Sequence, residues 1–141
     1  MKPELADLIE ISRFYGQRKE FVIAGGGNTS FKDEQSIWIK ASGFPLSDLA
    51  EENLVKLNRA KLRLIAEGIY SENPMEREEQ VKTDLYAAVE DPGMGLRPSV
   101  ETSLHDLINF RYVVHLHPAI INGILCSRNA RNLTLQYFGE K

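Results

Sequence analysis

Two histidines, His115 and His117, lie one residue apart at the end of the stretch R-Y-V-V-H-L-H-P, residues 111–118. In a β-strand, residues i and i+2 project from the same face, so both imidazoles would point in one direction. Neutral imidazole is a good ligand for Zn²⁺ and other transition metals, and a rigid strand holds two such ligands at little ordering cost. The spacing therefore predicts either two corners of a metal site or a purely structural pair of histidines.

An acidic residue, Glu101, lies shortly before this strand, in a segment whose apolar spacing predicts a helix over residues 99–109. With Ser99 as the N-cap, Glu101 in the first turn would favour the positive end of that helix. The functional alternative is a carboxylate that converges on the two histidines. His105, four residues after Glu101, would share its helical face and be a buried structural residue, a partner that orients Glu101, or a further metal ligand.

Two loops rich in glycine lie upstream, G-G-G-N-T-S at residues 25–30 and A-S-G-F-P at residues 41–45. Neither follows the pattern of a P-loop or of a dinucleotide-binding turn. Glycine nevertheless lets backbone N–H groups turn inward around an anion, and Asn, Thr and Ser side chains add short donors. Each loop is therefore predicted either to bind an anion or to be an ordinary turn in which Asn and Ser bond their own backbone.

The elements that must position these residues alternate between helices and strands, which favours a layered α/β fold. Residues 54–58 have an ambiguous pattern that fits a short strand, and the tail after residue 126 carries no clear signal. The expected helices cover residues 3–18, 59–67, 75–90, 99–109 and about 118–126, and the other expected strands cover residues 30–32, 36–41 and 111–117.

The composition is that of an ordinary globular protein: the chain has 141 residues, 43% hydrophobic and 26% charged, which fits one domain. No apolar run approaches the roughly 20 residues of a membrane span, and the charged N-terminus lacks a signal-peptide core, so we expect a cytoplasmic location. A net charge of −3 without a cluster of Lys and Arg argues against a nucleic-acid partner. The single Cys126 excludes an internal disulfide and a cysteine-based zinc cluster, so a metal would need His and carboxylate ligands.

Four motifs, taken in order and spacing, resemble the class II aldolase/adducin-like domain family: G-N-T-S (27–30), S-G (42–43), P-S-V-E (98–101) and H-L-H-P (115–118). The stretches A-G-G-G-N-T-S-F-K-D and I-W-I-K-A-S-G are most similar to the aldolase part of bifunctional rhamnulose-1-phosphate aldolase/lactaldehyde dehydrogenases. The resemblance runs from about residue 5 to residue 127. It implies an α/β/α layered fold with a central, mainly antiparallel sheet flanked by helices.

The resemblance also implies a role for each matching residue. His115 and His117 would bind a divalent metal, most often Zn²⁺, and Glu101 would be the catalytic acid/base. The implied reaction is cleavage of a ketose 1-phosphate, such as rhamnulose 1-phosphate, to dihydroxyacetone phosphate and lactaldehyde. The family further implies a homo-oligomer, commonly a four-fold symmetric tetramer. The implied phosphate-binding residues are Gly27, Asn28, Ser42, Gly43 and Ser99.

The chain departs from the family pattern in three respects. No histidine follows His117 to act as the third metal ligand, and Val100 stands where several aldolases have a second phosphate-binding serine. The family domain normally continues beyond the length of this chain, so we expect residues 1–141 to be its N-terminal portion. The alternatives are another sugar-phosphate enzyme of the family, such as an epimerase or dehydratase, an adducin-like interaction module, or an inactive fragment.

Overall fold

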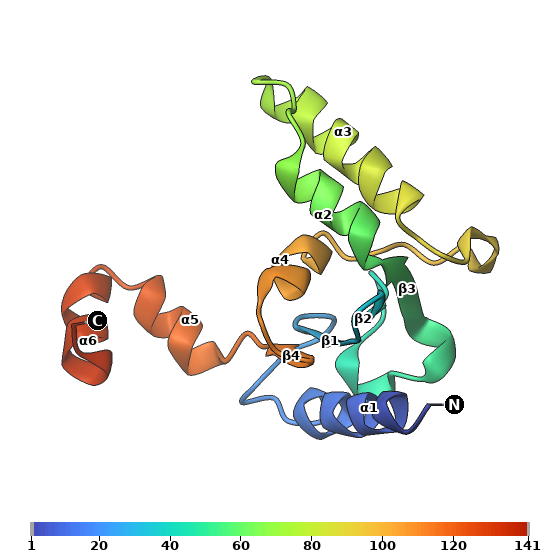
Figure 1. The fold of residues 1–141 in the computed structure, drawn as a ribbon. Coiled ribbons are helices and arrows are strands. Elements are labelled where there is room, and N and C mark those ends of the chain that lie inside the picture. Colours follow the sequence, from blue (N-terminus) through green and yellow to red (C-terminus); the bar gives the residue numbers. More distant parts are fainter. Residues whose placement is uncertain (1, 141) are drawn as a thin grey trace.

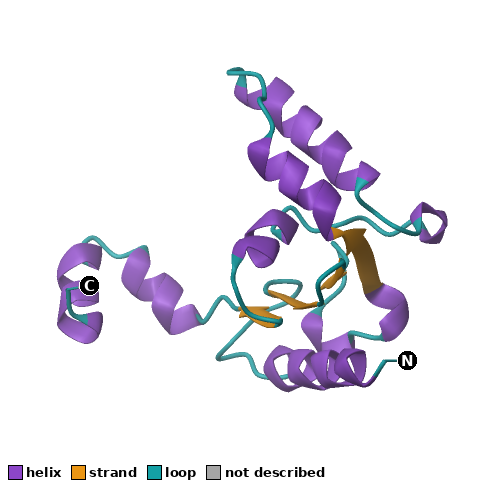
Figure 2. Ribbon diagram, in the orientation of Figure 1, coloured by secondary structure: helices purple, strands orange, loops and turns teal. Residues whose placement is uncertain are grey.

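The computed structural model describes residues 2–140, which form a four-stranded antiparallel sheet with helices on both of its faces (Figures 1 and 2). The order of the strands in the sheet is β3-β2-β1-β4. The predicted α/β architecture with a mainly antiparallel central sheet is therefore confirmed.

The strands are β1 (Asn28–Lys32), β2 (Ser36–Lys40), β3 (Leu54–Asn58) and β4 (Tyr112–His115). The α-helices are α1 (Pro3–Gly16), α2 (Arg59–Glu67), α3 (Pro74–Ala87), α4 (Thr102–Leu107), α5 (Ala119–Leu125) and α6 (Ala130–Phe138). Three short 3₁₀ turns are η1 (Leu46–Asp48), η2 (Glu51–Asn53) and η3 (Pro92–Met94).

The hairpin of β1 and β2 is closed by its turn residue Asp33. The Asp33 carboxylate accepts the backbone N–H groups of Gln35 and Ser36 at 2.9 and 2.8 Å, so the side chain itself holds the turn. Phe31 lies opposite Trp38 in the antiparallel register that follows. The predicted hairpin is confirmed, and its first strand begins earlier than expected because residues 28 and 29 also pair with β4.

Two apolar clusters cover the two faces of the sheet. On one face, Leu8 of α1 packs among Phe31 and Trp38, and on the other, Ile37 and Ile39 pack among apolar residues of α2 and α3. The alternation of Ile37, Trp38 and Ile39 between the faces follows the two-residue period of a strand. Figure 1 shows α1 below the sheet and the α2–α3 pair above it, so the sheet is the middle layer.

The strand at residues 54–58 and the helix at residues 59–67 are confirmed, and the Asn58 side chain caps that helix by accepting the N–H of Lys61 at 3.1 Å. The predicted helix over residues 75–90 ends earlier, at Ala87. The next residues turn to the sheet instead, since Val89 forms a bridge with β3. The C-terminal helix α6 was not predicted.

Helices α5 and α6 extend away from the sheet and pack mainly against each other (Figure 1). Neither helix contains a buried residue, although Ile120, Leu125 and Tyr137 are large apolar or aromatic side chains. The predicted helix after Pro118 is confirmed, with Pro118 at the N-cap. Across residues 2–140, no helix combines the length and the apolar character needed to cross a membrane.

Candidate metal centre

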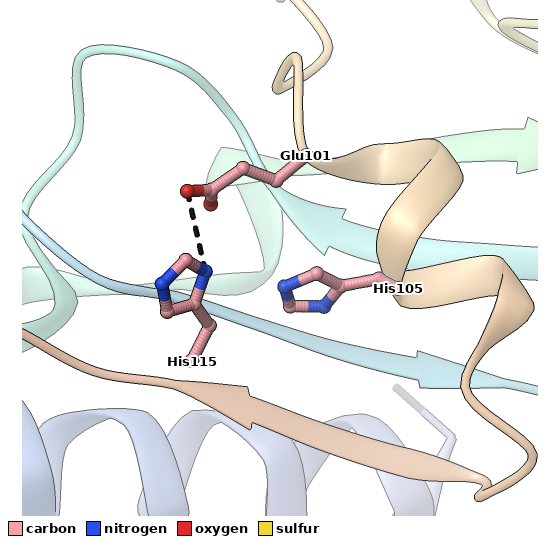
Figure 3. A group of neighbouring side chains, drawn as sticks. All are labelled: Glu101, His105 and His115. Atoms are coloured by element: carbon pink, nitrogen blue, oxygen red, sulfur yellow. Dashed lines mark ion pairs between the residues drawn. The ribbon is translucent and has the colours of Figure 1, made fainter. Parts of the chain in front are cut away.

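The centre is built where β4 ends and α4 begins. His115 is the last residue of β4, and Glu101 immediately precedes α4. The Glu101 Oε1 atom lies 3.2 Å from His115 Nδ1 (Figure 3). The His115 Nδ1 atom is buried, and no aligned hydrogen bond satisfies it among residues 2–140, so Glu101 lies close to this nitrogen without satisfying it. The Glu101 carboxylate thus lies beside the histidine strand, as the functional alternative for this residue predicts.

The start of α4 differs from the sequence prediction. The helix was expected to begin with Ser99 as N-cap, but it begins at Thr102, and Glu101 occupies the N-cap position without a side-chain capping bond. The physical reason is a tight turn before the helix, because the Ser99 hydroxyl accepts the N–H of Glu101 at 3.2 Å and the Ser99 carbonyl accepts the N–H of Thr102 at 3.1 Å. This turn presents the Glu101 side chain to His115.

His105 is the third member of the group. It is fully buried, and its Nδ1 atom shares a hydrogen bond of 2.8 Å with the hydroxyl of Ser30 on β1. Burial lowers the pKa of His105 to about 4, and the nearby Glu101 charge opposes this only in part, so His105 is neutral at pH 7. Its Nε2 atom is buried and lacks a hydrogen-bond partner among residues 2–140. Figure 3 shows the His105 and His115 rings beside the Glu101 carboxylate.

His117 lies beyond the end of β4, which is shorter than the strand predicted for residues 111–117. Its backbone N–H donates to the carbonyl of Phe21 at 3.1 Å, and this contact takes the chain away from the sheet. The two side chains still meet, with His117 Nε2 at 3.1 Å from His115 Nε2. His115 therefore has one ring nitrogen facing His117 and the other facing Glu101 and His105.

Two sets of ligand atoms share His115. The first is the pair of Nε2 atoms of His115 and His117. The second is the group Glu101, His105 and His115, whose ligand atoms all lie within 4.8 Å of one another. Imidazole nitrogen and carboxylate oxygen are both common ligands of Zn²⁺. The donor chemistry therefore suits a divalent metal, and the two buried imidazole nitrogens without a hydrogen bond support that conclusion.

The first glycine loop lies directly beside His115. Asn28 is opposite His115 in the β1–β4 register and is only 2% exposed. Gly27 has φ +74°, and a Cβ there would lie 3.0 Å from the His115 carbonyl oxygen, so this position needs glycine for both conformation and space. A Cβ at Gly26 would lie 3.4 Å from His117 Nδ1. The backbone of this loop therefore lies close to both histidines.

The second loop is tied to the segment that carries Glu101. The N–H of Ser42 donates to the Arg97 carbonyl at 2.9 Å, and Gly43 has φ +94°. The Lys40 ammonium contacts this loop by donating to the Phe44 carbonyl at 2.8 Å. Burial lowers the pKa of Lys40, while the charge of Glu101 opposes the shift. The loop at residues 41–45 thus approaches the centre through residues 97–101.

A model of the class II aldolase and adducin N-terminal domain matches residues 6–139. The chain belongs to this family. Among its relatives is the uncharacterized oxidoreductase YuxG of Bacillus subtilis, which is 26% identical over an alignment 144 residues long. The alignment covers 96% of this chain and 20% of YuxG. The chain therefore spans about a fifth of the length of that relative, and the word oxidoreductase describes a much longer protein.

A solved class II aldolase domain has the same fold. It is the N-terminal class II aldolase domain of a conserved protein from Thermoplasma acidophilum, with a TM-score of 0.78 and 20% identity. The match covers 96% of this chain and 65% of that one. Class II aldolases use a divalent metal, and the group of Glu101, His105 and His115 is a set of side chains that could hold one.

Sequence reasoning on this class II aldolase domain favoured a buried structural role for His105, which is fully buried, but did not identify its contact with Ser30. The available signal was the four-residue spacing between Glu101 and His105, which places His105 one helical turn after the N-cap residue Glu101. The partner Ser30 lies on another element far away in the sequence, so no local pattern pointed to it.

Proposed function

We propose that this chain is a metal-dependent aldolase domain that cleaves a ketose 1-phosphate, such as rhamnulose 1-phosphate, to dihydroxyacetone phosphate and lactaldehyde. The observation that carries the proposal is the position of His115. Its Nδ1 atom lies 3.2 Å from the Glu101 carboxylate, and its Nε2 atom lies 3.1 Å from His117 Nε2. A proton-transfer group thus lies next to a pair of metal-ligand atoms. This combination is what a reaction at the carbon beside a ketone needs.

His115 and His117 would hold the metal, with Zn²⁺ as the expected ion. Their Nε2 atoms are close enough to share one ion, and His117 is exposed, which leaves coordination positions open to substrate. A divalent metal bound there would act as a Lewis acid for the substrate ketone. The alternative set uses Glu101 as a ligand and so removes it from proton transfer. We therefore keep Glu101 outside the ligand set and available for proton transfer, on the side of His115 opposite to His117.

Glu101 would be the acid/base. Cleavage moves the electron pair of the C3–C4 bond to C3, the Glu101 carboxylate would accept the proton of the C4 hydroxyl as the aldehyde forms, and C3 takes up a proton. Glu101 would deliver the proton to C3 and, in the reverse direction, remove it. A positioned general acid or base contributes roughly 10²–10⁴-fold. The phosphate would lie against Gly27, Asn28, Ser42, Gly43 and Ser99.

We also infer a homo-oligomer, with the tetramer common in the family as the expected form. The exposed Ile120 and Leu125 of α5 and Tyr137 of α6 support this inference, because apolar side chains that project from the body of a domain favour association with another copy. Light scattering of the purified chain would give the mass. A monomer at all concentrations would contradict the inference.

The metal assignment is tested by elemental analysis of the purified chain and of the single variants His115→Gln, His117→Gln and His105→Gln. We expect wild type and His105→Gln to retain the metal, and the other two to lose it. Loss in His105→Gln with retention in His117→Gln would instead establish the set of Glu101, His105 and His115. Absence of metal from wild type would favour the adducin-like role as an interaction module.

The reaction is tested by release of dihydroxyacetone phosphate from rhamnulose 1-phosphate. Glu101→Gln keeps the size of the side chain but cannot exchange a proton, so we expect release to fall about 10²–10⁴-fold while the metal content is unchanged. Bound metal without any release by wild type would exclude this substrate and favour another sugar-phosphate reaction, such as epimerisation or dehydration.

A further inference from the structure

A cleft of about 620 Å³ lies between α3 and residues 97–103, and Ser42 contributes to its lining. Its walls combine apolar side chains, such as Val81 and Leu85 of α3, with charged ones. A hollow that is partly apolar and carries a few convergent polar groups is the usual form of a small-molecule site. Of the residues assigned above to the substrate, only Ser42 lines this cleft. The cleft is therefore a neighbouring space that the metal centre does not explain.

Three cationic side chains line the cleft, namely Arg77, Lys82 and Arg97. Lys82 is already paired, because its Nζ lies 3.2 Å from Glu79 Oε1. Within residues 2–140, neither arginine has a carboxylate within ion-pair distance. The acidic residue of the lining, Glu78, lies next to Arg77 on α3, which makes the α3 wall less favourable for an anion. Arg97, on the opposite wall, is the better candidate for binding one.

Arg97 is held against the second glycine loop. Its backbone carbonyl accepts the N–H of Ser42 at 2.9 Å, and its Nη2 atom would lie 3.9 Å from a Cβ at Gly43. The guanidinium group is thus adjacent to the backbone of the loop that is expected to hold a phosphate. Lys40, the other cation at this loop, already donates to backbone carbonyls and is buried. Arg97 is the cation that remains available to a ligand.

We propose that Arg97 binds the phosphate of the sugar phosphate at the Ser42–Gly43 end of the phosphate site assigned above, where the cleft adjoins that site. A guanidinium group donates two parallel hydrogen bonds to phosphate oxygens and stays charged at any physiological pH. Val100 lines the same cleft, is 89% exposed and has no polar side-chain atom. Val100 therefore offers a ligand no hydrogen bond, and Arg97 is the charged donor on this wall of the cleft.

This inference rests on the proposed function, because that function makes the ligand a sugar phosphate. Calorimetric titration of the full chain with dihydroxyacetone phosphate tests the phosphate contact, and dihydroxyacetone is the matched ligand without phosphate. We expect Arg97→Gln to weaken binding of dihydroxyacetone phosphate about 10- to 100-fold and to leave dihydroxyacetone unaffected. Arg97→Lys keeps the charge but loses the fork of donors, so an intermediate loss is expected.

The matched control is Arg77→Gln, which removes the other unpaired arginine of the cleft on the far wall. We expect its affinity to stay within about twofold of wild type, because its charge acts only at long range. Equal losses in Arg97→Gln and Arg77→Gln would overturn the proposal, as would unchanged affinity in Arg97→Gln. A wild type that binds dihydroxyacetone phosphate no better than dihydroxyacetone would overturn it as well.

The two proposals fail in different ways. Arg97-dependent binding of dihydroxyacetone phosphate without any cleavage of rhamnulose 1-phosphate would support the phosphate contact and refute the reaction. Cleavage that proceeds with an unchanged KM in Arg97→Gln would support the reaction and refute the role of Arg97.

Discussion

The Lys32→Met substitution tests how the sheet holds α4, the helix that carries His105. Lys32 ends β1, is only 5% exposed, and donates from Nζ to the carbonyl oxygens of His105, Asp106 and Ile108. Carbonyl groups at the end of a helix have no partner within it and carry the negative end of its dipole. Methionine keeps most of the apolar stem of lysine but offers no donor.

The expected magnitude follows from these contacts. A buried acceptor that loses its donor costs about 1–3 kcal/mol, and a hydrogen bond from a charged donor contributes about 1.5–3 kcal/mol. The three bonds do not add, because they share one ammonium group whose own burial opposes folding. That burial lowers the pKa of Lys32, and Asp106 compensates only in part. We expect Lys32→Met to lower the free energy of unfolding by about 2–4 kcal/mol.

The matched control is Lys61→Met, because Lys61 makes the same kind of contact in an exposed position. Its Nζ donates to the carbonyl of Ala87, the last residue of α3, at 2.7 Å. A cation at an exposed helix end contributes about 0.3–1 kcal/mol. Urea unfolding followed by circular dichroism compares both variants with wild type. The comparison holds when the slope of the unfolding free energy against urea concentration is the same in all three proteins. Equal losses in the two variants would refute the reasoning that the buried ammonium organises the end of α4.

Two further predictions concern packing and pH. Gly16→Ala would place a Cβ 2.2 Å from the Ser47 backbone nitrogen, so we expect it to lower the free energy of unfolding by about 1–3 kcal/mol or more. Gly123→Ala in α5, where a Cβ would meet nothing within 4 Å, should raise it by up to about 1 kcal/mol, and thermal unfolding compares the two. Burial would raise the pKa of Glu90, but its bonds to Lys56 and a serine hydroxyl outweigh this and hold the pKa below its usual value. The stability that Glu90 contributes is present above its ordinary pKa and is lost as the pH falls through the lower folded-state value. Glu90→Gln should therefore make the free energy of unfolding fall less steeply as the pH drops below the ordinary pKa of glutamate, and parallel curves for variant and wild type would contradict this.

Local chemistry was sufficient to predict the hairpin and most of the helices. The turn at Asp33 depends on a side chain that bonds the backbone two and three residues later, and the capping by Asn58 has a similarly short range. Helical and strand periods are also properties of neighbouring residues. Such features leave a pattern in the sequence whatever the rest of the chain does.

Element ends were predicted less well, because they depend on competing contacts. Helix α3 ends before residue 90 since Val89 pairs with β3, a strand far back in the sequence. Strand β4 ends at His115 since the N–H of His117 bonds the loop at Phe21. The late start of α4 follows from the bonds of Ser99, whose side chain could equally have served as an N-cap.

The sequence by itself determined which ligand and proton-transfer groups the chain has, and that His115 and His117 are close enough along the chain to share an ion. It also placed Glu101 one helical turn before His105. Only the tertiary structure decided that Glu101 lies 3.2 Å from His115 and that Ser30 holds a fully buried His105 beside them. The physical reason is that these contacts join separate elements, and their distances follow from how β1, β4 and α4 pack together rather than from any local period.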